Sequence, residues 1–266
     1  MGRLDGRVAI VTGGARGVGL GVARAFASEG ARVVIANRSE AAAAEAVAGI
    51  ERDFADRGGA ACAIPTDVAD EASVRSLVGA VVDRFGRVDA LVNNATPSGG
   101  TARLERMRQD VMEQYVRVNY YAAFWSMQAA FPHMKAAGFG RIVNMASLNG
   151  INAHRFTAMY NGAKEALRAL SRTAAAEWAR YGVTCNVICP AAVSDAWLGF
   201  ERFDPEGARK ILDANPSHRM GDPEADIGPL AVFLASEESR YVTGNTIHAD
   251  GGGHINGVPW TFDLPE

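Results

Sequence analysis

The chain has 266 residues, of which 48% are hydrophobic and 21% are charged, and its formal net charge is −3. This composition is that of a globular protein, and it gives no reason to expect binding to nucleic acid or to an anionic membrane. No apolar run approaches the roughly 18 residues of a membrane span, and no signal-peptide core is present, so we expect a cytoplasmic protein. The three cysteines are Cys62, Cys185 and Cys189, and no two of them form a CxxC pair. We therefore expect buried, reduced thiols and no metal site.

The chain opens with a βαβ pattern. Residues 7–12 form a short apolar run, a glycine-rich turn follows, residues 20–29 have helical spacing, and 32–36 form a second apolar run. Further helices are expected at 40–57, 70–85, 104–117, 120–137 and 159–181, and further strands at 60–65, 87–92, 140–146 and 183–188. Because the strands are continuous apolar runs, helices should cover both faces of the sheet. The sequence therefore predicts an α/β fold, a single doubly wound parallel sheet flanked by helices on both faces, in one domain spanning 1–266.

Two of these helices carry more apolar surface than one sheet face can cover. Residues 120–125 are apolar nearly all round, and so is much of 163–178. Such helices are usually buried on more than one side. We therefore expect a homo-oligomer that packs through them.

Tyr160 and Lys164 lie four residues apart in an expected helix and therefore share one face. A free tyrosine has a pKa of about 10, and a cation within about 4–6 Å lowers it by roughly 1–3 units. Lys164 can supply that cation, and Ser147, after the strand at 140–146, can hydrogen-bond the oxygen that Tyr160 protonates. Together they form a general acid/base with an oxyanion stabiliser for a carbonyl–alcohol interconversion. A Tyr–Lys pair is common on helices, so this interpretation depends on what precedes it.

A glycine loop precedes it. Gly13, Gly17 and Gly19 lie between an expected strand and an expected helix, where glycines let the backbone approach a pyrophosphate at the helix N-terminus. A tight turn without a ligand is the alternative, but the βαβ context favours a dinucleotide.

The residues around the second strand indicate which dinucleotide is bound. NAD sites usually place an acidic residue there, whereas an arginine suits a 2′-phosphate. Here the strand is followed by Asn37 and Arg38, and Arg16 lies in the glycine loop. Two guanidinium groups and no carboxylate favour NADP(H) over NAD(H). The alternative is that Arg38 is a solvated strand-end charge.

An ordered set of motifs resembles the short-chain dehydrogenase/reductase family over nearly the whole chain. The matching pieces are Thr12-Gly13-Gly14-Ala15-Arg16-Gly17-Val18-Gly19, Asp67-Val68, Asn93-Asn94-Ala95, Asn119, Ser147, Tyr160-x-x-x-Lys164, Val242-Thr243-Gly244 and Asp250-Gly251-Gly252. The resemblance implies a Rossmann-type oxidoreductase, dimeric or tetrameric, that moves a hydride between nicotinamide C4 and a carbonyl carbon.

The resemblance also implies a role for each matching residue. Tyr160 is the general acid/base, Lys164 lowers its pKa and hydrogen-bonds the nicotinamide ribose, and Ser147 polarises the carbonyl. Asn119 holds a water that links Lys164 to a proton relay. With the residues already named, the expected cofactor-binding set is Gly13, Arg16, Gly17, Val18, Gly19, Asn37, Arg38, Asp67, Val68, Asn94, Ala95, Tyr160, Lys164, Pro190 and Val193.

Two segments depart from the family pattern. Thr96 stands where the family usually has glycine, and it adds a β-branched side chain. After the sixth strand the family usually reads Pro-Gly-x-Val/Ile-x-Thr, whereas this chain has Pro190-Ala191-Ala192-Val193-Ser194-Asp195. Val193 can still offer its backbone to the carboxamide. Asp195 replaces a hydroxyl near the pyrophosphate, and Ser194 is a candidate substitute.

The segment at about 193–216 is expected to fold over the substrate, as in the family. Its large apolar residues are Trp197, Leu198, Phe200 and Phe203, which form either an apolar wall for a ring-bearing substrate or the core under a loop. Thr96, Asn149 and His154 are further substrate-binding candidates, although such a histidine more often has a local partner.

We therefore expect an oxidoreductase acting on a small-molecule ketone or secondary alcohol, partly apolar or cyclic. The altered segment at 190–195 leaves two alternatives open. One is a non-catalytic nucleotide-binding protein on the same fold. The other is a non-redox reaction, such as dehalogenation or epimerisation, that retains Tyr160.

Overall fold

The computed structural model describes residues 2–256, within which seven parallel strands form one sheet in the order β3-β2-β1-β4-β5-β6-β7. The chain moves outward from β1 to β3 and then crosses back to β4, and ligands bind at such a reversal of strand order. The strands are β1 Val8–Thr12, β2 Arg32–Asn37, β3 Ala60–Pro65, β4 Ala90–Asn93, β5 Gly140–Met145, β6 Val183–Pro190 and β7 Thr246–Ala249.

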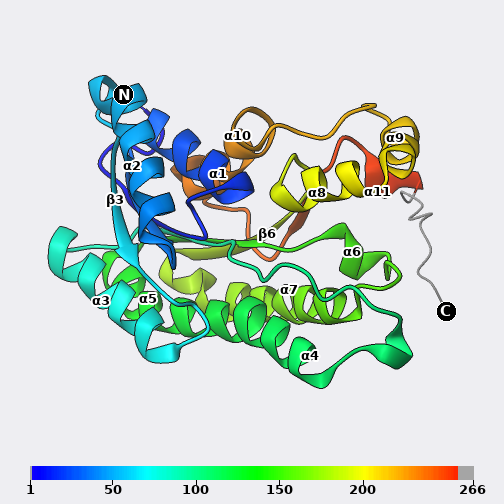
Figure 1. The fold of residues 1–266 in the computed structure, drawn as a ribbon. Coiled ribbons are helices and arrows are strands. Elements are labelled where there is room, and N and C mark those ends of the chain that lie inside the picture. The colour runs from blue at the N-terminus through cyan, green and yellow to red at the C-terminus, as the bar shows by residue number, and fades with distance from the viewer. Residues whose placement is uncertain (1, 257–266) are drawn as a thin grey trace.

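Helices cover both faces of this sheet, as the sequence predicts (Figure 1). Ala9 and Val11 of β1 pack with α1, α2 and α10, whereas Val8 and Ile10 face α3, α5 and α7. The alternation follows from the two-residue period of a strand. The helices are α1 Gly17–Ser28, α2 Glu40–Phe54, α3 Glu71–Phe85, α4 Gln109–Val116, α5 Ala122–Ala137, α6 Leu148–Ile151, α7 Ala158–Trp178, α8 Asp195–Phe203, α9 Pro205–Ala214, α10 Gly228–Ala235 and α11 Gly253–Asn256.

The largest difference from the expected elements lies between β4 and β5. The segment 104–108 is a 3₁₀ turn and extended chain rather than the start of a helix. Instead of two separate helices, α4 and α5 are joined by a π-helical turn at Arg117–Tyr121 into one continuous helix. A π turn keeps the helix running with i→i+5 hydrogen bonds, and it occurs frequently at functional sites.

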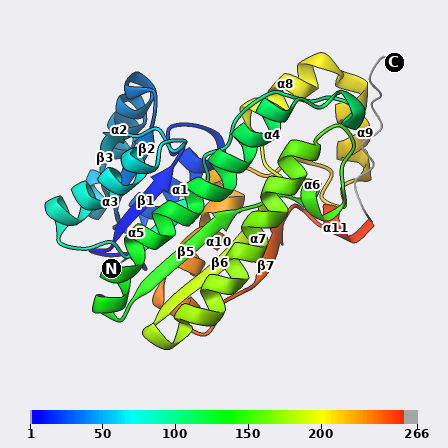
Figure 2. The same cartoon turned by 90° about the horizontal axis from the view of Figure 1, so that it is seen from below.

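The segment expected to cover the substrate folds into α8 and α9. Figure 1 and Figure 2 both place these helices at the same end of the molecule as α6 and α11. β7, a strand of four residues, is not among the expected strands. Cys185 and Cys189 are buried and Cys62 is half-buried, all as free thiols. No helix within residues 2–256 has both the length and the apolar character that a bilayer crossing requires.

Candidate active site

Two neighbouring elements bring the predicted catalytic side chains to the carboxyl ends of the strands. Ser147 follows β5 and caps α6, where its Oγ accepts a hydrogen bond from Asn149 N at 3.2 Å. Tyr160 and Lys164 lie about one turn apart on α7. Lys164 Nζ donates to Met145 O at 2.6 Å and so reaches the end of the strand that delivers Ser147. The structure thus places these three side chains in one cluster.

Burial sets the protonation of this cluster. It raises the pKa of Tyr160 to about 12, while a hydrogen bond with Ser147 acts to lower it. Burial also lowers the pKa of Lys164, which is 2% exposed, to about 7. Removal from water disfavours the charged form of both groups. The expectation that the pKa of Tyr160 is lowered is therefore wrong. Lys164 Nζ lies 5.4 Å from the centre of the Tyr160 ring, but burial has the largest effect on the pKa and keeps the phenol neutral.

Asn119 lies in the π turn and is buried. Its Nδ2 donates to Tyr115 O at 3.0 Å, the carbonyl that its own N–H would reach in an α-helix. Its Oδ1 is buried and has no hydrogen-bond partner among the described residues. A buried orphan acceptor suits an ordered water, which is the role that the resemblance implies for this residue.

The glycine loop has the geometry that a dinucleotide requires. Gly13 and Gly17 have φ values of +63° and +52°, which favour glycine. A Cβ on Gly19 would lie 2.3 Å from Gly13 O, so a side chain there would fill the loop. Asn94 Nδ2 donates to Gly13 O at 3.3 Å and joins the loop to β4. α1 begins at Gly17 without a side-chain cap, which leaves its N–H groups for an anion. These residues fit a pyrophosphate.

The predicted adenosine-side residues lie at neighbouring strand ends. Asn37 ends β2 and pairs with Pro65 at the end of β3, just before Asp67 and Val68. Val68 is buried and packs with the half-buried Ala95, whereas Asp67 is exposed. Arg38 is exposed and makes no ion pair with any residue in 2–256. Val18, in the first turn of α1, is half-buried at the base of the glycine loop.

Arg16 and Asp195 resolve one departure from the family pattern. They form an ion pair of 2.9 Å between the glycine loop and α8. Ser194 Oγ accepts a hydrogen bond from Trp197 N at 3.2 Å, so Ser194 caps α8. Arg16 thus neutralises the carboxylate that replaces the usual hydroxyl. No spacing in the sequence indicates this pair, because its members lie far apart in the chain.

The segment after β6 is fixed by a short parallel bridge. Pro190 ends β6, and Val193 N donates to Gly221 O at 2.9 Å. The expected backbone contact of Val193 with a carboxamide is therefore available from its carbonyl only.

Comparison with known proteins decides the family. Residues 13–254 match a short-chain dehydrogenase family model whose description is enoyl-(acyl carrier protein) reductase. The chain belongs to the short-chain dehydrogenase/reductase family. It is 36% identical over 256 residues to a 12alpha-hydroxysteroid dehydrogenase of Clostridium sp., covering 95% of this chain and 98% of that one. It is 37% identical over 261 residues to a sorbitol dehydrogenase of Cereibacter sphaeroides, covering 94% and 98%.

Solved structures agree with this assignment. Levodione reductase superimposes with a TM-score of 0.89 at 30% identity, covering 95% of this chain and 99% of that one. As a short-chain dehydrogenase/reductase, the protein is an oxidoreductase that acts on CH–OH groups with a nicotinamide nucleotide.

On the substrate side of this short-chain dehydrogenase, the candidates differ in their contacts. Asn149 Oδ1 accepts a hydrogen bond from Ser147 Oγ at 3.2 Å, so it directly contacts the serine hydroxyl. Thr96 is exposed in the loop after β4. Burial lowers the pKa of His154 to about 4, which keeps the half-buried imidazole neutral.

The apolar residues of α8 divide into two groups. Trp197 and Phe200 are half-buried, with ring centres 6.0 Å apart. Leu198 and Phe203 are 40% and 79% exposed. None of the nine α8 residues, all described, is buried, so α8 is not core under a loop. A wall at this end of the molecule can include Trp197 and Phe200.

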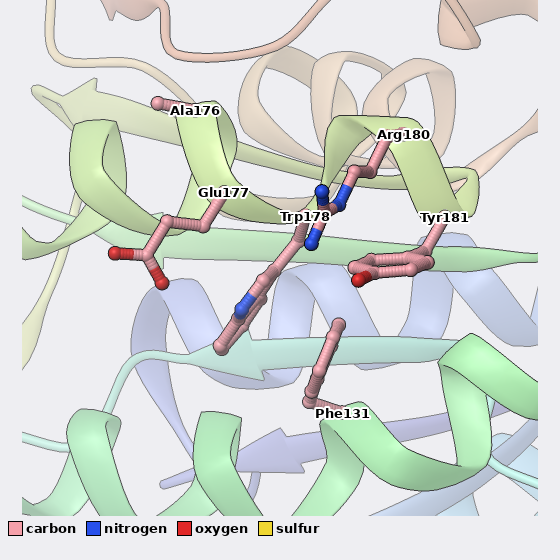
Figure 3. A pocket seen from close by; sticks show the side chains of 6 residues that line it. All are labelled: Phe131, Ala176, Glu177, Trp178, Arg180 and Tyr181. Carbon is pink, nitrogen blue, oxygen red and sulfur yellow. The ribbon is translucent and has the colours of Figure 1, made fainter.

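A pocket of ≈ 480 Å³ lies at the C-terminal end of α7 (Figure 3). Tyr160 lies in the first turn of the same helix. Phe131 of α5 stacks on Trp178 with ring centres 4.3 Å apart, and Tyr181 meets Phe131 edge-on at 5.7 Å. None of the catalytic candidates lines it. It lies between the two helices for which subunit contacts are expected. The lining residues are Phe131, Ala176, Glu177, Trp178, Arg180 and Tyr181.

Proposed function

We propose that this enzyme transfers a hydride between NADP(H) and a ketone or secondary alcohol of a partly apolar, cyclic small molecule, within one dinucleotide-binding and catalytic domain. One observation carries the proposal: Tyr160 is a half-buried phenol with a raised pKa, next to a serine hydroxyl and a buried lysine with a lowered pKa. Groups whose environments displace their pKa values mark acid/base sites.

In the direction of reduction, Tyr160 gives its proton to the substrate oxygen. Ser147 Oγ donates a hydrogen bond to the same oxygen and stabilises the charge that develops there. Lys164 and a water on Asn119 Oδ1 return the proton to Tyr160. The glycine loop and α1 hold the pyrophosphate, and the nicotinamide supplies the hydride. Family membership and the presence of all four residues argue against a non-catalytic protein.

The preference for NADP(H) rests on Arg38. It is exposed at the end of β2, and the nearest acid along the chain, Glu40, already lies in α2. Because Arg16 pairs with Asp195, Arg38 is the guanidinium left for a 2′-phosphate. The KM values of NADPH and NADH test this, and a lower KM for NADH contradicts it.

Two features support a cyclic substrate. Trp197 and Phe200 offer ring surfaces on α8, and one relative is named for a hydroxysteroid. The name of another, sorbitol dehydrogenase, points to an open-chain polyol. We would assay hydroxysteroids, cyclohexanediols and polyols with NADP⁺ and NAD⁺, following reduced nicotinamide by absorbance. Turnover of cyclic alcohols is the expected result. Turnover of polyols alone contradicts the substrate class, and a product formed without reduced nicotinamide indicates the non-redox alternative.

Assembly into a homodimer or homotetramer through α5 and α7 is part of the proposal. Tyr121 and Phe124, in the π turn and in α5, are 45% and 37% exposed and offer aromatic surface for such a contact. Light scattering at micromolar concentration tests assembly, and a monomer contradicts it.

A further inference from the structure

The loop between β4 and α4 follows the carboxyl end of β4, next to the strand β5 that ends just before Ser147. It carries Thr96, and Gly99 and Gly100 follow with φ values of +81° and +85°. Residues 98–101 are exposed, so few buried apolar contacts hold the loop in place. Such a segment opens at low free-energy cost unless specific contacts fix it.

One buried side chain supplies such a contact. Tyr115 of α4 is 4% exposed, and its hydroxyl donates to Gly99 O at 2.6 Å, with Pro97 O at 3.4 Å. Gly100 lies close to this helix, because a Cβ built there would lie 2.7 Å from Val111 Cγ1 and 3.8 Å from Tyr115 Cε2. The tyrosine therefore holds the middle of the loop, while Ala102 N, which donates to Phe156 O at 3.0 Å, holds its end.

The same residue contacts the reaction centre on its other sides. Its ring meets the Tyr160 ring edge-on, with centres 6.1 Å apart and planes at 90°. Its carbonyl accepts the hydrogen bond from Asn119 Nδ2 at 3.0 Å. Tyr115 thus joins the loop that carries Thr96, the phenol and the π-turn asparagine. An edge-to-face pair of this kind favours one ring orientation.

We propose that Tyr115 is a positioning residue, whose hydroxyl holds the loop at 96–100 as a wall of the substrate site while its ring orients Tyr160. The hydroxyl then governs substrate binding and the ring governs the chemical step. Only the predictions for KM and kcat rest on the proposed function; the prediction that Tyr115 holds the loop does not.

The test separates the hydroxyl from the ring. Tyr115→Phe removes the hydrogen bond and keeps the ring. A net hydrogen bond corresponds to about two- to tenfold in an equilibrium. Amide hydrogen exchange at Ala102, whose N–H donates to Phe156 O, should therefore accelerate about two- to tenfold, and the KM of the most rapidly oxidised cyclic alcohol should rise by a similar factor. The kcat and the cofactor KM should stay unchanged. Tyr115→Leu, which also removes the ring, should lower kcat as well.

Tyr241→Phe is the matched control, because Tyr241 is 98% exposed. Unchanged exchange at Ala102 in Tyr115→Phe overturns the proposal, and so does a fall in kcat with an unchanged substrate KM. If the wild-type protein oxidises no alcohol, the proposed function fails, but the exchange experiment still decides whether Tyr115 holds the loop.

Discussion

The guanidinium of Arg16 lies 2.9 Å from the carboxylate of Asp195, and this pair connects the glycine loop to the first turn of α8. A Cβ on Gly17 would lie only 3.9 Å from Ser194 Cβ, so the two segments are neighbours in their backbones as well. Both groups are largely exposed, and the pair is therefore weak. Its importance lies in its charges, which stand beside the site of an anionic ligand.

Asp195→Ala removes a negative charge from that site and frees Arg16. We expect the Kd for NADPH to fall by up to about fivefold, the limit set by an exposed pair of about 1 kcal/mol. NADH, with one phosphate fewer, should gain less. Fluorescence titration at low salt measures both. Asp213→Ala, which breaks the exposed Arg209–Asp213 pair on α9, is the control. A weaker affinity for NADPH in Asp195→Ala would show that the carboxylate does not repel the ligand.

Tyr160→Phe tests the acid/base. The ring and its contact with Tyr115 remain, but the proton donor is lost. We expect kcat to fall by about 10²–10⁴-fold, the range for general acid–base catalysis. The Kd for NADPH should stay within about twofold, since the glycine loop is untouched. Steady-state kinetics and fluorescence titration measure the two quantities, and retained turnover would refute the mechanism.

The substitution Lys164→Met tests whether burial lowers the pKa of Lys164, and the quantity measured is the free energy of unfolding. The pKa of Lys164 is lowered to about 7 when folded. Between about pH 7 and 10.5 the unfolded state binds more protons, so the free energy of unfolding rises with pH in this window. Below about pH 7 the full cost of the buried charge is present. We expect Lys164→Met to be more stable than the wild type near pH 7, on the order of a few kcal/mol, and this advantage to shrink towards pH 10.

Urea unfolding of both proteins across this pH range measures the effect, and their difference isolates Lys164 from other groups. Tyr160 acts in the opposite sense at higher pH: its raised pKa means that stability falls as pH rises from about 10 to 12. A difference between the two proteins that does not vary with pH would contradict the lowered lysine pKa.

Gly19→Ala tests the nucleotide cradle. The added Cβ would lie 2.3 Å from Gly13 O, and the loop must shift to accommodate it. Overpacking costs about 1–3 kcal/mol, so NADPH affinity should fall about five- to hundredfold. In α3, Gly79→Ala meets nothing within 4 Å and should keep its affinity, while gaining about 0.5–1 kcal/mol in stability. Equal affinities of the two variants would place the pyrophosphate elsewhere.

The sheet and the cluster around Tyr160 could be predicted because their causes are local. Continuous apolar runs such as Val8–Thr12 indicate strands covered on both faces, and a four-residue spacing puts Tyr160 and Lys164 on one helix face. The Ser39 cap of α2, whose Oγ accepts a hydrogen bond from Ala42 N at 3.3 Å, is another feature with a local cause. Each of these needs only neighbours along the chain.

The remaining features depend on contacts that the chain order does not reveal. The π turn at Arg117–Tyr121 has no compositional signal, since its residues also suit an α-helix. In the sequence, Tyr115 cannot be told from an ordinary core aromatic residue. Its role follows only from the structure, in which its hydroxyl donates to Gly99 O. The raised pKa of Tyr160 is a property of the assembled interior, where loss of water outweighs the hydrogen bond with Ser147.

The unbroken path of α4 and α5 through the π turn has a further consequence. Asn119 and the exposed Tyr121 lie two residues apart in one continuous helix. A partner surface that packs on Tyr121 would therefore also affect the position of Asn119, the residue proposed to hold the relay water. Specific activity followed through a dilution series would then serve as a readout of subunit dissociation, with no label on the protein.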